Sequence, residues 1–333
     1  MAKMIQQLND EIVFSFPDLH PDAVLRVAFQ RTLRTPDDGR TYSLPAGLGR
    51  FPLRNVDDLE RPPAEWVTHG GVALPMYGSE ALWISFSSQT GYPFAVKVAA
   101  GKINAVTGKP WESGLDDTPQ NYVAVPPQPW LDGFAVGNGV VRQFVAMPLG
   151  AGYSVEEQVT GAAEQGGIQI QVFPLRPELY RPRPVFAAAP SQAAMPRAMA
   201  APAAPAMGLG MGGRIDQKVY TSAHGLADWH PTTSSRCFVH LVNALVWRSL
   251  TGVEAPPTPV TAAEYERRGI PWFRWYDEGA PAEAGSEALA GLKSVAEMGA
   301  AKGDVPVTDN DSIDVTRVVT LHAYPGQVRE SPF

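Results

Sequence analysis

The sequence predicts a β-rich α+β fold, in which antiparallel, sandwich-like sheets carry C-terminal helices packed on them. Short apolar segments separated by tight-turn residues fill the first half of the chain. Apart from one short helix, apolar residues at helical spacing occur only in the last third. Between these parts, residues 185–213 are almost wholly Ala, Pro, Met and Gly, and Arg197 is their only charged residue.

The first half contains apolar segments of strand length bounded by turn residues. We expect strands over residues 25–33, 40–44, 82–87, 94–99, 134–136, 140–147 and 168–173. Two turns suit the positive φ angles of a tight hairpin, namely Pro36-Asp37-Asp38-Gly39 and Gly137-Asn138-Gly139. The regular spacing of these short strands is typical of a sandwich or a barrel.

Four segments are predicted to be helices. They cover residues 154–161, 235–249, 261–269 and 287–302. Ser154 with Glu157, and Thr261 with Glu264, have the spacing of a capping box, and Ser234 or Ser235 can cap the helix between them. We expect two more strands, over residues 214–220 and 317–321, that return to the sheet of the first half.

The predicted organisation has three parts: a β-rich region over residues 1–184, a flexible tether or insertion over 185–213, and a mixed helix and strand region over 214–333. Prolines interrupt any long helix in the middle part, and its closing glycines disfavour a strand. We expect the last part to pack with the first as one unit, because its strands would complete the first sheet.

Composition excludes several classes of function. The net charge of −7 and the absence of a Lys/Arg cluster argue against nucleic-acid binding. The single cysteine, Cys237, cannot form an internal disulfide, and residues 1–10 lack a secretory signal pattern. The longest strongly apolar run, 238–247, is about half of the ~20 residues that span a bilayer. We therefore expect a soluble, cytoplasmic protein without a membrane span or a cofactor.

One cluster has residue types used in nucleophilic catalysis. Cys237 would lie in the first turn of its predicted helix, where the helix dipole stabilises a thiolate, and His230 or His240 would act as the base. The alternative is that Cys237 is a small apolar residue of the core. His224 lies nearby, but only Cys237 and His240 have the spacing of paired zinc ligands, so no metal site is predicted.

Aromatic residues gather in two segments, 128–134 and 271–276. Both combine rings with polar side chains, which is the composition of a sugar-binding or partner-binding surface; core packing is the alternative. The candidate ligand-binding residues are Trp130, Asp132, Arg142, Trp272 and Trp275.

Four segments of the chain resemble a family of uncharacterised bacterial and fungal proteins that automated naming often labels "integral membrane protein". They are residues 128–134, 141–161, 234–247 and 291–299. The resemblance covers most of the chain outside the Ala/Pro/Met tract, and it implies no activity and no catalytic residues. Its label disagrees with the absence of a convincing membrane span in this sequence.

The sequence therefore predicts a non-catalytic structural or binding protein that assembles with itself. The assembly contacts would be Met195, Met199, Met207 and Met211, because methionine side chains adapt to contact surfaces. The glycine run after Met207 does not follow a strand and open a helix, as a nucleotide loop would. Two alternatives stay open: a cysteine-dependent hydrolase that uses Cys237, and a carbohydrate-binding module.

Overall fold

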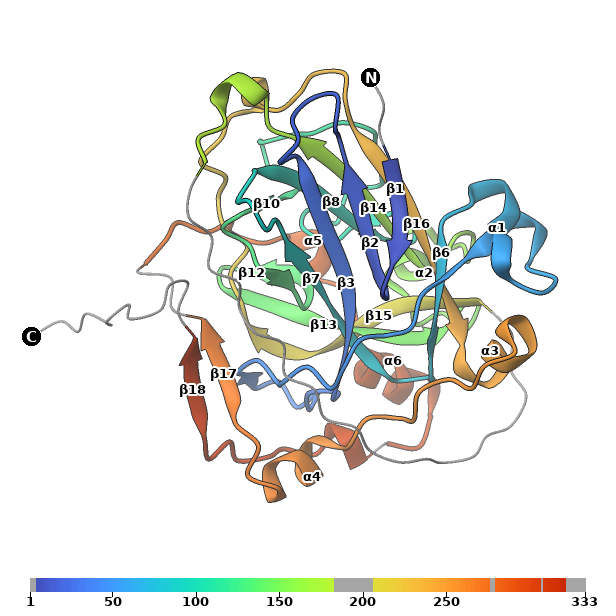
Figure 1. Ribbon diagram of the computed structural model, residues 1–333. Helices are drawn as coiled ribbons and strands as arrows, with labels where there is room; N and C mark the ends of the chain where they lie inside the picture. The colour runs from blue at the N-terminus through green and yellow to red at the C-terminus, as the bar shows by residue number, and fades with distance from the viewer. Residues whose placement is uncertain (1–3, 183–205, 276–278, 307, 322–333) are drawn as a thin grey trace, which may run out of the picture.

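Most of the chain belongs to, or covers, one large and mainly antiparallel sheet (Figure 1). The computed structural model describes residues 4–182, 206–275, 279–306 and 308–321. Within these ranges, sixteen strands form the large sheet and two more form a small separate sheet.

The elements follow one another along the chain with most strands before residue 182. The strands of that part are β1 (Met4–Leu8), β2 (Glu11–Ser15), β3 (Val24–Thr32), β4 (Thr41–Tyr42), β5 (Arg54–Asn55), β6 (Val72–Met76), β7 (Ala81–Ser87), β8 (Phe94–Ala100), β9 (Ile103–Asn104), β10 (Val123–Val125), β11 (Trp130–Leu131), β12 (Gly133–Gly137), β13 (Val140–Pro148) and β14 (Ile168–Pro174). The later strands are β15 (Ala206–Asp216), β16 (Ser235–Asn243), β17 (Trp272–Trp275) and β18 (Val318–Leu321). The α-helices are α1 (Ala64–His69), α2 (Val155–Thr160), α3 (Ala244–Thr251), α4 (Ala262–Arg267), α5 (Glu287–Ala290) and α6 (Val295–Lys302).

The two halves of the chain share the large sheet. Its main path runs β1-β2-β3-β7-β13-β15-β16-β14-β8-β10, so the late strands β15 and β16 lie between the early strands β13 and β14. Most neighbours are antiparallel, whereas β4 pairs in parallel with β15 and β6 in parallel with β16. Strands from both halves of the chain are therefore needed to make this sheet continuous.

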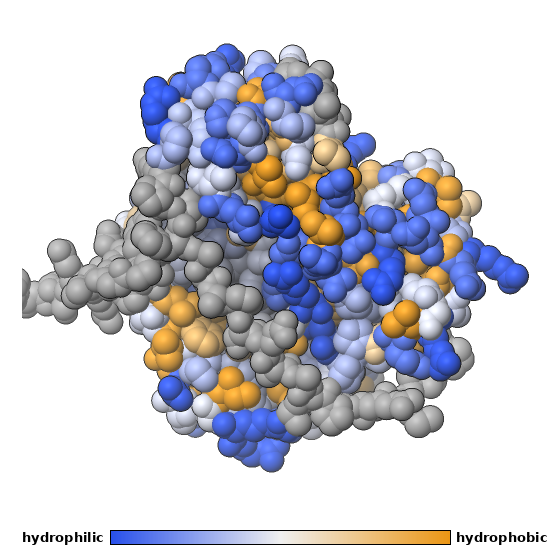
Figure 2. All heavy atoms as spheres, in the orientation of Figure 1, coloured by the Kyte–Doolittle hydropathy of each residue, from blue (hydrophilic) through white to orange (hydrophobic). Residues whose placement is uncertain are grey.

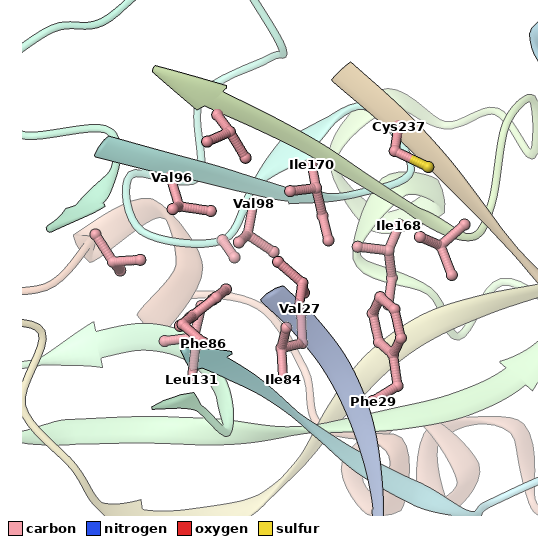
Figure 3. Packing of buried hydrophobic residues seen from close by; sticks show 14 of the residues in the cluster. Val27, Phe29, Ile84, Phe86, Val96, Val98, Leu131, Ile168, Ile170 and Cys237 are labelled. Atoms are coloured by element: carbon pink, nitrogen blue, oxygen red, sulfur yellow. The ribbon is translucent and has the colours of Figure 1, made fainter. Parts of the chain in front are cut away.

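The sheet bends back on itself and encloses one main apolar core (Figure 3). Val27 of β3 and Ile84 of β7 face Val98 of β8 and Ile170 of β14, and all four side chains are almost completely buried. Burial of each such side chain stabilises the fold by roughly 1.5–3 kcal/mol relative to exposure. The β-rich α+β class with sandwich-like layers, and helices mostly in the C-terminal part, is confirmed.

Local turn and cap signals were correctly predicted. Gly137-Asn138-Gly139 lies at the turn between β12 and β13, and Gly139 has a φ of +73°. At the start of α2, Ser154 and Glu157 form both hydrogen bonds of the capping box, and Gly161 closes the helix in the left-handed conformation. These signals act over a few residues, so they do not depend on the tertiary fold.

The hairpin predicted around Pro36–Gly39 is wrong. The end of β3 next to this turn pairs with β7 on one edge and bonds to residues 48–51 on the other, so it has no edge left for the segment after the turn. That segment instead places Thr41 opposite Arg214, in parallel with β15.

The predicted tether extends too far, because residues 206–213 are strand β15 in the interior of the sheet. The glycines permit a close approach of neighbouring layers rather than preventing a strand. A Cβ on Gly210 would lie 2.8 Å from the Tyr153 carbonyl oxygen, and a Cβ on Gly213 would lie 2.2 Å from the Pro36 carbonyl oxygen. Residues 183–205, with Met195 and Met199, lie outside the described residues.

Three further predictions in the second half need correction. Residues 235–243 are strand β16, and the helix that follows, α3, is capped by Asn243. The single helix predicted over 287–302 is two helices, α5 and α6, with separate caps at Ser286 and Ser294. The strand predicted over 317–321 is β18, which pairs in parallel with β17 in the small sheet and not with the first-half sheet.

The visible face of the molecule mixes polar and apolar residues, with the apolar ones in several small groups (Figure 2). Among the described residues, none of the helices combines the length and the apolar character needed to pass through a bilayer.

Candidate functional site

An open cleft of about 350 Å³ lies where three distant chain segments meet. They are residues 128–130, the stretch 216–220 that begins with the last residue of β15, and the end of β17 at Arg274 and Trp275; Leu44 completes the lining. The volume is within the range of small-molecule sites in proteins.

Two tryptophans from opposite parts of the sequence form the aromatic part of the cleft. The rings of Trp130 and Trp275 are 5.2 Å apart between centroids and nearly perpendicular, at 82°. Trp130 is held by the pairing of β11 with β7, opposite Ser85, and its ring also packs near Trp83. Both cleft rings are only half-buried, so part of their apolar surface faces solvent.

Two buried glutamines connect the segments that line the cleft. Gln128 donates from Nε2 to the carbonyl oxygens of Trp130 and Lys218, and it accepts at Oε1 from the Tyr220 amide. Gln217 accepts at Oε1 from the Asp132 amide and donates from Nε2 to the Asp132 carboxyl group at 2.6 Å. The glutamines therefore join residues 128–132 to residues 217–220 as a sheet ladder would.

Asp132 lies behind the cleft, where its side chain is almost wholly buried. Burial raises the pKa of this carboxyl group to about 7, although hydrogen bonds from Gln217 and Trp130 act in the opposite direction. Asp132 therefore titrates near neutral pH, but it contacts the scaffold of the cleft and does not line it.

Charged side chains border the opening of the cleft. Arg274 and Asp216 form an ion pair of 3.4 Å between Nε and Oδ2, and Lys218 also lines the cleft. Along residues 214–219 the exposed polar residues alternate with buried ones, so Asp216 and Lys218 share a face. Cationic side chains outnumber carboxylates at the opening.

The small sheet positions Trp275. The backbones of Leu44 and Phe273 exchange two hydrogen bonds of 2.8 Å, which attach β17 to the segment after β4. Phe273 and Trp130 both pack against a cluster formed by Leu44, Val141 and Ile215. The second aromatic segment is thereby held against the first.

Two residues predicted to bind a ligand lie elsewhere. Trp272 is completely buried between Tyr42 and Tyr265, and its indole N–H donates to Glu266. Arg142 is buried and forms ion pairs with Asp37 at 3.8 Å and with Glu297 of α6 at 3.4 Å. Both predictions are corrected: these side chains hold the C-terminal segment on the sheet.

The structure does not place Cys237 at the start of a helix. It lies on β16 with its side chain in the core beside Ile168 and Ile170 (Figure 3). Burial raises the pKa of the thiol to about 12, opposite to the change that activates a nucleophile.

Neither predicted base is directed at this thiol. Residues three apart on a strand face opposite sides, and His240 stacks on Trp66, with Nε2 2.9 Å from the Gly70 carbonyl oxygen. Burial lowers its pKa to about 4. The amide of His230 donates to Pro174, four residues along β14 from the partner of Cys237, or about 13 Å at the usual rise per residue.

The methionines of the described part of the tract are not at a surface. Met207 and Met211 have exposed fractions of 1% and 0%, because they belong to β15 in the interior of the sheet. Their predicted role as assembly contacts is therefore wrong.

Sequence reasoning missed Gln128, Gln217, Asp216, Lys218 and Arg274. The charged residues Arg214, Asp216 and Lys218 at alternate positions of the predicted strand 214–220 are a signal for the face that carries Asp216 and Lys218. The roles of the two glutamines depend on which segments meet, and nothing local in the sequence encodes that. Among the described residues, His, Cys, Asp and Glu side chains do not gather in groups of three that suit a metal ion.

Comparison of the chain with protein-family models, with curated proteins and with solved structures finds no match. The family resemblance of the sequence therefore stays a prediction.

Proposed function

We propose that this is a non-catalytic binding protein that holds a saccharide in the cleft between Trp130 and Trp275. One observation carries the proposal: two half-buried tryptophans from segments far apart in the sequence meet at right angles in an open cleft bordered by charged side chains. An aromatic pair that served only the core would be fully enclosed, as Trp272 is.

The chemistry of the lining fits a sugar ring. A pyranose has an apolar face of C–H bonds that stacks on an indole, and a rim of hydroxyl groups that accept and donate hydrogen bonds. Arg274 offers guanidinium donors and Asp216 offers carboxylate acceptors at the edge of the indole surface. A few polar groups beside apolar rings are the usual composition of a small-molecule site.

The charge at the opening narrows the class of ligand. Arg274 and Lys218 disfavour a cationic ligand, which would otherwise suit two tryptophan faces. A neutral saccharide or one with a carboxylate is compatible with this balance, and we expect uronic-acid oligosaccharides to bind more tightly than neutral ones of equal length.

The other predictions from the sequence concern location, self-assembly and a hydrolase activity. A cytoplasmic location and self-assembly stay predictions from the sequence. The cysteine-dependent hydrolase has no support from the placement of Cys237 and His240 among the described residues.

The test is titration calorimetry with a panel of neutral and uronic-acid oligosaccharides. We expect binding to the parent protein and a loss of at least roughly tenfold in affinity for Trp275→Ala, since aromatic contacts of this size contribute more than 1 kcal/mol. Trp111→Phe is the matched control, because Trp111 lies outside the cleft and its buried indole nitrogen has no hydrogen-bond partner within the described part of the chain. Equal affinity of the Trp275→Ala and Trp111→Phe variants, or no binding across the panel, would reject the proposal.

A further inference from the structure

We propose that two copies of this chain join through their β1 strands, which pair antiparallel about a twofold axis at Gln6. The inference rests on the edge of the large sheet, so it does not depend on the cleft or its ligand.

Strand β1 is the outermost strand of the main path of the sheet and, within the described residues, pairs only with β2. Its five residues keep a regular register with β2, from Met4 opposite Ser15 to Leu8 opposite Glu11, without a bulge. Figure 1 shows β1 beside β2 at the end of the series β1, β2 and β3. The free edge is therefore straight and continuous.

The apolar side chains of β1 are exposed, whereas those of its neighbour are buried. Met4, Ile5 and Leu8 have exposed fractions of 44%, 38% and 46%, while Ile12 and Phe14 of β2 have 0%. Proteins usually protect such an edge with a charge, a proline or a bulge. The segment Met-Ile-Gln-Gln-Leu has none of the three.

The turn after β1 determines which backbone groups face outward. Asn9 and Asp10 both have positive φ, of 51° and 59°, and form a two-residue turn between Leu8 and Glu11. The residues that flank such a turn exchange hydrogen bonds with each other, so Leu8, Gln6 and Met4 bond toward β2. The N–H and C=O groups of Ile5 and Gln7 then point to the free edge.

A second copy of β1 matches this edge. In antiparallel pairing centred on Gln6, Ile5 of one copy lies opposite Gln7 of the other, and these two residues exchange both backbone hydrogen bonds. The twofold axis repeats the pair, so every outward group of Ile5 and Gln7 has a partner, about four hydrogen bonds in all. Met4 then lies opposite Leu8 of the second copy.

Charge also favours a second copy. The chain carries a net charge of −7, so two copies repel each other overall. Strand β1 has no charged side chain, and Gln6 meets Gln6 at the axis without repulsion. An unrelated partner would need to supply the same spacing of outward groups, which β1 itself supplies by symmetry.

The edge is fixed in place before pairing. The Leu53 amide donates to Asp10 at 3.0 Å, Arg50 donates to the Asn9 carbonyl oxygen at 3.4 Å, and Arg50 forms an ion pair of 3.0 Å with Glu11. These contacts hold the hairpin on the rest of the molecule, so pairing requires little further ordering of the chain. Because five residues a side make a small interface, we expect a dimer that dissociates on dilution.

The first experiment measures molar mass by sedimentation over a wide range of protein concentration. We expect the parent protein to change from monomer to dimer, and Gln7→Pro to weaken the dimer roughly ten- to thirtyfold, because each copy loses one outward N–H donor. Gln7→Ala keeps that donor and is the matched control, which should dimerise like the parent. A parent protein that stays monomeric at every concentration, or equal dimerisation of the two variants, would overturn the proposal.

The second experiment tests the twofold register. Gln6→Lys places two like charges at the axis, as does Gln6→Glu, so each variant alone should dimerise more weakly than the parent. Mixed in equal amounts, the two variants should form a heterodimer at least as readily as the parent forms its homodimer. Gln6 is exposed on β1, so both substitutions leave the backbone pairing with β2 intact and should not unfold the protein. Failure of the mixture to dimerise would contradict pairing about Gln6.

Discussion

The cleft with Trp130 and Trp275 and the strand with Cys237 and His240 each contain a pair of predicted site residues. Only in the cleft do the two side chains of the pair contact each other. Cys237 and His240 are neighbours in sequence, and the alternation of a strand directs them to opposite faces. Trp130 and Trp275 are far apart in sequence, and three segments of the fold place their rings within 5.2 Å. Spacing along the chain indicates a site only when the secondary structure of the segment is right.

The largest expected effect concerns the titration of Asp132 behind the cleft. Its folded pKa is about 7 and its unfolded value is near 3.8, so between these values the folded state holds a proton that the unfolded state releases. Stability contributed by this group is complete below about pH 4 and falls as the pH rises to 7, by about 4 kcal/mol. Relative to the parent, Asp132→Asn should therefore gain about 4 kcal/mol between pH 4 and pH 8 in urea unfolding. A constant difference between the two proteins would contradict this.

His240, on the strand, should show the opposite slope. Its folded pKa is lowered to about 4, so below pH 6.5 the unfolded state binds a proton that the folded state excludes. The stability of the parent is therefore lost as the pH falls from 6.5 to 4, by about 3 kcal/mol, and His240→Gln should remove that loss. The measurement is the same series of urea unfolding curves. If His240→Gln and Asp132→Asn changed the pH profile in the same direction, the contrast between the two regions would fail.

The hydrogen bonds between Gln217 and Asp132 should stabilise the folded protein. Gln217→Leu removes two hydrogen bonds to Asp132 and leaves that buried carboxyl group and its amide short of partners. We expect a loss of about 2 kcal/mol in the free energy of unfolding at pH 5. Gln165→Leu, whose side chain bonds to Glu65 at the surface, is the control and should change stability by less than about 0.5 kcal/mol. An equal loss of stability in the two variants would show that the buried hydrogen bonds of Gln217 stabilise the protein no more than a surface hydrogen bond does.

The smallest effect is expected at Cys237. Cys237→Ala removes one buried sulfur from the core and should cost about 1 kcal/mol. In the parent protein, iodoacetamide should label this thiol only after unfolding, because burial raises its pKa and excludes the reagent. Mass spectrometry of native and urea-treated samples measures the labelling. Rapid labelling of the native protein near neutral pH would revive the hydrolase alternative.

The features that the sequence predicts correctly are local. The Gly137-Asn138-Gly139 turn and the Ser154–Gly161 helix use signals contained within a few residues. The segment Pro36–Gly39 has an equally good turn signal, yet β7 and residues 48–51 already occupy both edges of the end of β3, so no hairpin forms there. The sequence alone predicts a turn, but it does not predict which strand pairs with the segment that follows the turn.

The glycines of β15 show why part of the fold and the site was beyond local reasoning. In the sequence, Gly210 and Gly213 indicate the absence of a strand. In the structure, their lack of a side chain lets the backbones of Tyr153 and Pro36 lie close to β15. The same limit applies to the residues predicted to bind a ligand: Trp130 and Trp275 line the cleft, Asp132 lies behind it, and Trp272 and Arg142 belong to other clusters. These distinctions arise from contacts between segments more than a hundred residues apart.

The order of strands in the large sheet has a consequence for the growth of the chain on the ribosome. When residues up to β14 have been made, the group β1-β2-β3-β7-β13 and the group β14-β8-β10 share no strand, because β15 and β16 have yet to be translated. The native sheet therefore closes last at its middle: the inner edge of β13 has no partner strand until β15 has been translated, and the inner edge of β14 has none until β16 has been translated. Contacts over such long sequence separations slow folding, so a nascent chain of this protein depends on shielding of those two edges until its central strands arrive.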